Sequence, residues 1–321
     1  MAACRDAKGP LDRPLVAVFR WLCLGLLPLG LWAQSQDFSD PLEQRDFTAA
    51  ARAFQDLNYE RAEREFGEFA QTWKDSAFKV EAVLRQAQAR YHLTNYPGAL
   101  SLLTAGLPQA GKLADQYQFW LGEVHFRVGN LDRAASTYAL LCRDFTNSPH
   151  FLAAAHNEAL ARFRLGQHSN VVALLRAPGG SFQRAAKTSP TNNLVVSGTL
   201  LLGEALLATR DYAAAEQSVQ ALAERRLEPE VDWQRRFLLG RVLAEASRTA
   251  EALPVATNLV RLAVALKQPL LLAESFALQG AVFEKLGELP AAVASFTNNF
   301  TTNAPAALDR KSTRLNSSHE W

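Results

Sequence analysis

The chain has 321 residues, of which 48% are hydrophobic and 21% charged, with only 17 glycines and 14 prolines. This composition excludes collagen-like, Pro/Gly-rich and highly charged disordered classes, and the length allows two ordinary domains or one elongated array. Three cysteines are too few for a disulfide framework, and a formal net charge of +2 is too small to indicate a nucleic-acid partner.

Residues 1–35 have the three parts of a secretory signal. Basic residues up to Arg20 precede an apolar stretch, WLCLGLLPLGLW, and the small-x-small sequence AQS follows it. The stretch is shorter than the roughly 20 residues that span a bilayer, and Pro28 interrupts it, so a membrane anchor is the weaker interpretation. We expect cleavage after Ser35 and export of the mature chain to a bacterial periplasm or the extracellular space.

The C-terminal end has a different origin in our interpretation. Residues 309–319, DRKSTRLNSSH, resemble codon by codon the translation of a common sequencing-library adapter, and Glu320 and Trp321 would come from its sample index. We therefore exclude residues 309–321 from the fold, as a non-native tail, and expect natural sequence to continue past Leu308. Since both end segments carry an excess of basic residues, residues 36–308 are close to neutral.

Residues 36–308 repeat a pattern of two small residues twelve positions apart with a turn between them, and seven copies align at intervals of 35–44 residues. In the third copy, apolar residues recur with the helical period on both sides of a Gly-Asn turn, which predicts a helical hairpin. We expect Gly129, Gly166 and Gly287 to end first helices in the left-handed conformation, and Asn130 and Asp211 to supply turn or capping oxygens. The small positions are Ala50 and Ala62, Ala87 and Ala99, Gly122 and Ala134, Ala159 and Val171, Gly203 and Ala215, Gly240 and Ala252, and Gly280 and Ala292.

These hairpins resemble tetratricopeptide repeats. Residues 120–149, WLGEVHFRVGNLDRAASTYALLCRDFTNSP, match the family pattern of small residue, aromatic, Gly-Asn turn, Ala, aromatic and final Pro, in a form similar to exported bacterial members. The resemblance implies an all-α fold, a right-handed superhelical solenoid of about seven antiparallel helical hairpins. It also implies a scaffold for protein–protein interaction. Other solenoids of helical pairs remain the structural alternative.

One long interval divides the repeats. The 44-residue spacing from Val171 to Ala215 exceeds its neighbours, and the excess falls in residues 178–193, PGGSFQRAAKTSPTNN, whose composition disfavours helix. We therefore expect repeats 1–4 in residues 36–177, a mobile, exposed loop in residues 178–193, and repeats 5–7 of the same continuous solenoid in residues 194–308.

No catalytic motif is found in the repeat region. Its five histidines fall in three repeats without a metal-ligand spacing, and it has no nucleophile elbow, phosphate-binding glycine loop or CxxC pair. Cys142 follows Leu141 on a predicted second helix, where we expect a buried, inert thiol. We predict no enzyme activity, no cofactor and no metal.

The resemblance implies that the first helices of the hairpins line a concave groove. An aromatic residue follows the first small residue by four positions in four successive repeats, about one turn along nearly the same side of the helix. These rings either face a partner or fill the core between hairpins, and for Phe126 and Phe163 we expect a partner. The candidate groove residues are Phe54, Tyr91, Phe119, Glu123, Phe126, Arg127, Phe163, Arg164, Leu200, Glu204, Leu207, Phe237 and Arg241.

The expected partner is a peptide or protein, bound during assembly or maintenance of a bacterial envelope. The groove lacks the paired Lys and Asn residues that would clamp a terminal carboxylate. We expect no nucleic-acid partner and no stable membrane anchor after signal cleavage. Two alternatives stay open: the positioning module of an enzyme whose catalytic domain follows residue 308, and a structural protein that self-associates through its C-terminal end.

Overall fold

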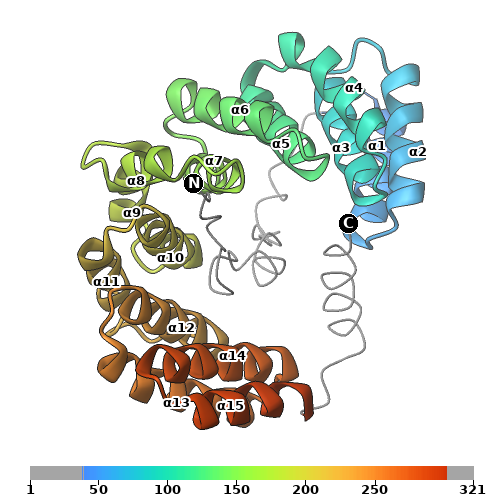
Figure 1. The fold of residues 1–321 in the computed structure, drawn as a ribbon. Helices are drawn as coiled ribbons and strands as arrows, with labels where there is room; N and C mark the ends of the chain where they lie inside the picture. Colours follow the sequence, from blue (N-terminus) through green and yellow to red (C-terminus); the bar gives the residue numbers. More distant parts are fainter. Residues whose placement is uncertain (1–37, 39, 302–321) are drawn as a thin grey trace, which may run out of the picture. The chain divides into compact units, whose positions relative to one another are not determined.

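The computed structural model describes residue 38 and residues 40–301, which form helices joined by short turns, with no strand among them (Figure 1). The predicted signal peptide in residues 1–35 and the predicted adapter-derived tail in residues 309–321 lie outside the described residues. The chain divides into two compact units between Gly198 and Thr199, inside one helix. The part before this boundary is named the N-terminal unit here, and residues 199–301 are named the C-terminal unit.

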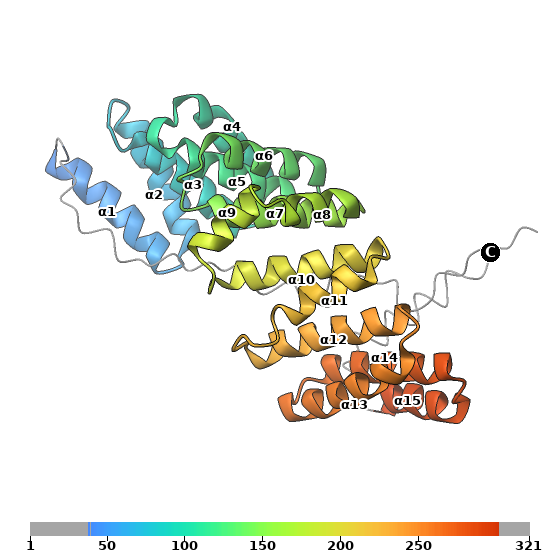
Figure 2. The ribbon, with the colours of Figure 1, turned by 90° about the vertical axis from the view of Figure 1, so that its left-hand side faces the viewer.

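Four helical hairpins and one additional helix build the N-terminal unit. In the first three hairpins, the second helix packs against the first helix of the next hairpin, as Figure 2 shows for the blue and green helices, whereas the second helix of the fourth hairpin packs against the additional helix. Two short 3-10 turns, Leu107–Gln109 and Gly111–Leu113, precede the third hairpin. The helices are α1 (Pro41–Gln55), α2 (Tyr59–Thr72), α3 (Lys79–His92), α4 (Tyr96–Gly106), α5 (Ala114–Arg127), α6 (Leu131–Asp144), α7 (Phe151–Arg164), α8 (His168–Arg176) and α9 (Ser181–Thr188).

Three further hairpins extend into the C-terminal unit, so the described chain has the seven hairpins that the repeats predict. Helix α10 begins before the unit boundary and ends after it. In this unit α12 packs against both α11 and α13, and α14 against α13 and α15. The helices are α10 (Asn193–Ala208), α11 (Tyr212–Gln220), α12 (Pro229–Glu245), α13 (Thr249–Leu266), α14 (Pro269–Leu286) and α15 (Leu289–Thr301).

The small residues of the repeat allow the helices to approach closely, as predicted. A Cβ atom on Gly122 would lie 2.5 Å from the ring of Tyr138 on the second helix of the same hairpin. A Cβ on Gly240 would lie 2.9 Å from Leu278 on the first helix of the next hairpin. Both distances are shorter than carbon atoms tolerate, so a larger residue would push the helices or side chains apart.

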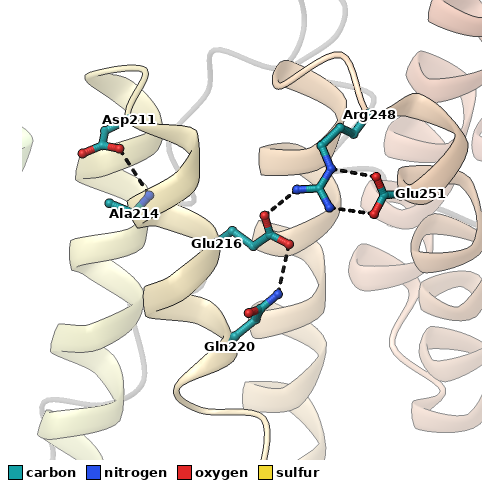
Figure 3. A network of polar contacts seen from close by, with 6 residues as sticks. All are labelled: Asp211, Ala214, Glu216, Gln220, Arg248 and Glu251. Carbon is teal, nitrogen blue, oxygen red and sulfur yellow. Dashed lines mark hydrogen bonds and ion pairs between the residues drawn. The ribbon is translucent and has the colours of Figure 1, made fainter.

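The turns inside the hairpins share one backbone conformation. Gly129, Gly166 and Gly287 have φ values of 82°, 75° and 80°, which confirms the predicted left-handed ends of α5, α7 and α14. Asp211 caps α11 by accepting a hydrogen bond from the backbone N–H of Ala214, at 3.2 Å (Figure 3). Asn130 occupies the cap position of α6, where its backbone oxygen accepts a hydrogen bond from the N–H of Ala134 and its side chain makes no cap hydrogen bond.

The expected loop in residues 178–193 is partly helical, so the prediction of an exposed loop is wrong for α9. The side chains of Phe182 and Ala185 on this helix are buried. A Cβ on Gly198 would lie 2.3 Å from the Phe182 ring, so the missing side chain leaves the space that this ring fills. Burial of an aromatic ring stabilises α9 despite the Gly, Pro and Ser residues around it.

One helix among the described residues is long and apolar enough to pass a simple length and hydropathy test for a membrane span, namely α13. It packs between α12 and α14, and its residues Ala252, Ala256 and Leu259 are fully buried there. Only 22% of this helix is buried, so its place in the helical stack accounts for one face of it and leaves other apolar side chains, such as Val264, exposed.

Candidate protein-binding surface

Three rings of the predicted aromatic series lie in a row on the first helices of the N-terminal unit. Phe54, Tyr91 and Phe126 stand near the C-terminal ends of α1, α3 and α5, and each is partly exposed. They occupy the same position of three successive repeats, so the helical repeat itself generates their alignment.

An arginine from the next first helix lies over each of these rings. Arg85 Cζ is 5.9 Å from the centre of the Phe54 ring, and Arg127 Cζ is 5.8 Å from that of Tyr91. Arg127 also donates a hydrogen bond from Nε to the Tyr91 hydroxyl, at 2.7 Å. These contacts join α1 to α3 and α3 to α5, and a guanidinium over an aromatic face is attracted by the negative potential of the ring.

The third pair has the shortest approach. Arg164 Cζ, on α7, lies 4.4 Å from the centre of the Phe126 ring on α5. Arg127 and Arg164 are both exposed, whereas Arg85 is partly buried and forms an ion pair with Glu81. We name the six residues of the three pairs the aromatic–arginine row: Phe54, Arg85, Tyr91, Arg127, Phe126 and Arg164.

Two other predicted aromatic residues contact histidines rather than arginines. Phe163 is only 9% exposed, and its ring centre lies 4.9 Å from that of His168. Phe119 is partly buried and stacks on His150, with the ring centres 4.4 Å apart. The burial of Phe163 favours a core position for this ring, in contrast to our expectation from the sequence.

A network of buried polar side chains lies behind the row. Glu123, directly after the small residue Gly122, accepts hydrogen bonds on Oε1 from the Tyr138 hydroxyl at 2.6 Å and from Asn157 Nδ2 at 2.8 Å. Its side chain is buried, and this burial raises the pKa of the Glu123 carboxyl against the effect of these hydrogen bonds and of Arg127. The network therefore joins α5, α6 and α7.

His156 extends this network to the start of α10. Its Nδ1 lies 3.0 Å from Asn157 Oδ1, and its Nε2 lies 2.9 Å from Ser197 Oγ. Asn157 donates its side-chain N–H to Glu123, so its side-chain oxygen accepts a hydrogen bond from Nδ1–H of His156. Nε2 of His156 then accepts a hydrogen bond from the Ser197 hydroxyl. Burial lowers the pKa of His156, which agrees with this neutral form of the ring.

Serine, histidine and asparagine connected in this way also resemble a nucleophilic catalytic arrangement. Here Ser197, His156 and Asn157 are all buried among packed helices. A nucleophile has to reach its substrate, and a buried polar group has to be hydrogen-bonded. The arrangement fits the second requirement and not the first, so we assign it a structural role.

In the C-terminal unit, the predicted charged residues are buried as a pair. Arg241 Nη1 on α12 lies 2.7 Å and 2.8 Å from the two carboxylate oxygens of Glu204 on α10, and both residues are less than 10% exposed. Leu200 and Leu207 on α10 are also buried, and the partly buried Phe237 stacks on the fully buried Trp233. The structure buries most of these residues between packed helices, and a partner contact for them stays a prediction.

Glu274 on α14 is a functional candidate that the sequence analysis missed. Its Oε2 atom is buried without a hydrogen-bond partner. Burial raises the pKa of this carboxyl to about 7, and the positive charge of Arg241 acts in the opposite direction. The only sequence signal is its place on a first helix, six residues before the small residue Gly280.

On the outside of the C-terminal unit, Arg248 connects two hairpins (Figure 3). Its Nη1 lies 2.5 Å from Glu216 Oε2 on α11, and its Nε and Nη2 donate to the two oxygens of Glu251 on α13, at 2.7 Å and 2.6 Å. Gln220 donates to the other oxygen of Glu216, at 3.0 Å. Because Arg248 is exposed, we treat this network as a contact between hairpins that contributes little to stability.

Cys142 has the properties expected of an inert thiol. It is buried on α6, and burial raises the pKa of its thiol to about 12. The thiolate is the reactive form, so this thiol is a poor nucleophile at neutral pH. No group of three or more His, Cys, Asp or Glu residues that could hold a metal ion occurs within the part of the chain that the structure describes.

Comparison with known proteins supports the repeat fold. A family model described as tetratricopeptide repeat matches residues 84–149 and 200–263. Solved structures with the same fold include a tetratricopeptide repeat protein from Parabacteroides merdae, with 11% identity over 84% of this chain and 96% of that one and a TM-score of 0.57. The C-terminal part of a repeat protein from Cytophaga hutchinsonii has 17% identity over 82% and 98% of the two chains and a TM-score of 0.60.

The apo form of RapI is similar as well, with 12% identity over 85% of this chain and 90% of that one and a TM-score of 0.58. No curated protein sequence matches the chain. At these identities the likeness concerns the fold, which is the all-α superhelical repeat predicted from the sequence.

Proposed function

We propose that this chain, which a tetratricopeptide-repeat family model matches over residues 84–149 and 200–263, is a scaffold that holds a peptide segment or another protein on the first helices of its hairpins. The aromatic–arginine row is the observation that carries the proposal. Its rings are partly exposed and recur at the same position of successive first helices, and apolar groups that gather at a surface mark sites of protein–protein interaction. Partly buried rings held by neighbouring side chains are also typical of residues that dominate the energy of protein interfaces.

For the compartment and process, we propose export and a role in envelope assembly or maintenance. The support is the leader-like sequence of residues 1–35 and its predicted cleavage after Ser35. Terminal sequencing of exported protein tests this proposal. We expect a mature chain that begins at or close to Gln36, and a product that begins at Met1 would contradict it.

Substitution of Phe126 by Ala tests the binding role of the row. We expect the variant to lose more than about 1 kcal/mol of affinity for proteins captured from the envelope fraction of the source organism, since binding energy concentrates in a few aromatic residues. Phe145, a partly buried ring just after α6 and outside the row, supplies the control variant Phe145→Ala. Equal capture by wild type and both variants would contradict the proposal.

A second candidate function, self-association, is favoured by exposed apolar residues on α15. Leu289 is 61% exposed and Val293 is 64% exposed, one helical turn apart. Solution scattering over a range of protein concentrations tests this candidate. A mass that rises with concentration in the wild type, and does not in a Leu289→Glu/Val293→Glu variant, would support it.

A further inference from the structure

The arginines of the aromatic–arginine row come from three successive first helices. Arg85, Arg127 and Arg164 belong to α3, α5 and α7, and each guanidinium lies over the ring that precedes it in the row. The ring restricts the motion of the arginine side chain that lies over it, even when no ligand is bound. Less entropy is then lost when the arginine binds a ligand.

Near this row, two arginines are exposed and the neighbouring carboxylates are buried or partly buried. Arg127 and Arg164 are exposed, whereas Glu123 is buried and hydrogen-bonded to Tyr138 and Asn157. Another carboxylate close to the row, Glu81, is partly buried and lies 3.5 Å from Arg85. The guanidinium groups of Arg127 and Arg164 therefore lie nearer the surface than these two carboxylates.

We propose that the aromatic–arginine row binds an acidic, partly apolar segment of a partner protein through the side-chain carboxylates of that segment. This inference rests on the proposed function and specifies its ligand. Arginine forms planar, two-point hydrogen bonds with carboxylates, which supplies the acidic preference. The rings of Tyr91 and Phe126 offer apolar area between the arginines, which supplies the preference for apolar side chains.

The spacing of the helices predicts the spacing of the acidic residues. Successive first helices pack mainly on second helices and only slightly on one another, so they are separated by at least the roughly 8–10 Å of packed helices, and an extended chain advances about 3.3 Å per residue. A segment that crosses α5 and α7 would therefore place a carboxylate near each exposed arginine if its acidic residues were at least about three positions apart.

The same geometry argues against recognition of a chain terminus. A single terminal carboxylate can meet one arginine, whereas the row has exposed arginines at the same repeat position on two successive first helices, α5 and α7. Recognition by side chains predicts that blocking both ends of a peptide leaves its binding unchanged.

Fluorescence anisotropy with the full chain tests the inference. The probe is a labelled, end-blocked peptide of repeated Glu-Leu-Ser units, long enough to cross three first helices, and its counterpart has Lys in place of Glu. We expect the Glu peptide to bind at least about tenfold more tightly than the Lys peptide, with a preference that weakens as salt is added.

The variant Arg127→Gln/Arg164→Gln should lose at least about tenfold in affinity for the Glu peptide, which is about 1.4 kcal/mol. The matched control is Arg61→Gln/Arg143→Gln, which removes the same charge from exposed arginines on the second helices α2 and α6. We expect the control to stay within about twofold of wild type, with the small loss due to net charge.

Equal binding of the two peptides, binding of neither, or equal loss in the two double variants would overturn the inference. Thermal unfolding of each variant identifies any loss of affinity that comes from misfolding. If the double variant is misfolded, Arg164→Lys replaces it, because lysine keeps the positive charge and lacks the planar guanidinium. The proposed function is tested separately, because partner capture that depends on Phe126 would survive if the Glu peptide failed to bind.

Discussion

The two units of the molecule use arginines on first helices in different ways. Arg127 and Arg164 in the N-terminal unit follow the small residue of their repeat by five positions, and both are exposed over aromatic rings. Arg241 in the C-terminal unit follows Gly240 directly and is buried against Glu204. The distance of an arginine from the small residue of its repeat therefore decides whether its side chain is exposed to solvent or buried between helices.

Glu123 and Glu204 agree with this rule. Each directly follows the small residue of its repeat, and each is buried. The small residue marks the line where helices approach most closely, so the next position lies beside that line and is covered by neighbouring helices. A position one turn later lies near the end of the helix, where fewer neighbours cover it.

The largest expected effect is on the stability of the C-terminal unit. Arg241→Ala leaves Glu204 buried without its partner, and we expect a loss of about 3–5 kcal/mol in the free energy of unfolding. Urea unfolding measures this value. Arg248→Ala is the matched control, because it removes an exposed arginine that also contacts carboxylates, and it should cost at most about 1 kcal/mol. Equal losses would show that burial does not separate the two arginines.

Two rings at the same repeat position sharpen the comparison within the N-terminal unit. Phe163→Ala should cost about 3 kcal/mol of stability, because the ring is buried and its removal leaves a cavity. Phe126→Ala should cost clearly less, since this ring is partly exposed. Thermal unfolding of the two variants provides the test, and a larger loss for Phe126→Ala would contradict the assignment of Phe163 to the core.

The next effect is a pH dependence that arises from Glu274. Its pKa is raised to about 7 from an ordinary value of 4.5, so the folded state holds the proton more tightly than the unfolded state does. This group therefore favours folding at low pH, and its contribution is lost as the pH rises through about 7. Glu274→Gln keeps a neutral side chain at this position at every pH.

We expect the Glu274→Gln variant to gain stability relative to wild type, on the order of 2 kcal/mol, between about pH 4 and pH 8. Urea unfolding at several pH values measures the difference between the two proteins. Other buried carboxyls such as Glu123 occur in both proteins, and their contributions cancel in this difference. A constant difference across the pH range would mean that Glu274 does not titrate as proposed.

The smallest effect is expected for Arg164. Its side chain is exposed, and a cation–π contact at an exposed site contributes about 0.5–1 kcal/mol. Arg164→Gln should therefore lower stability by no more than about 1 kcal/mol, as determined by thermal unfolding. A loss as large as that of Arg241→Ala would make Arg164 a structural residue and remove the contrast between the two units.

The sequence was sufficient to predict the hairpins because the small residues and turns are local features that recur at every repeat. Left-handed turn residues were predicted only at glycines, yet Leu57, Thr94, Arg210 and Ser247 adopt the same conformation, with φ between 59° and 62°. Non-glycine residues rarely adopt it, so composition alone misses them. Their alignment with Gly129 in the repeat was the signal that could have found them.

The candidate site was predicted less completely. The periodic rings followed from the repeat, but the burial of Phe163 depends on the neighbouring helices that surround it. Helix α9 was missed because Gly, Pro and Ser dominate its surroundings, although Phe182, Ala185 and Ala186 have helical spacing. Glu274 and the bonds of Glu123 depend on side chains brought together from different hairpins, which no local pattern reveals.

Hydrogen–deuterium exchange of the full chain, with and without the Glu-Leu-Ser peptide, most directly tests the contrast between the exposed row and the buried pair. We predict slower exchange near the C-terminal ends of α3, α5 and α7 when the peptide is present, and no change around Glu204 and Arg241. Protection confined to second helices or to the C-terminal unit, or no protection at all, would contradict the assignment of the aromatic–arginine row as the binding surface.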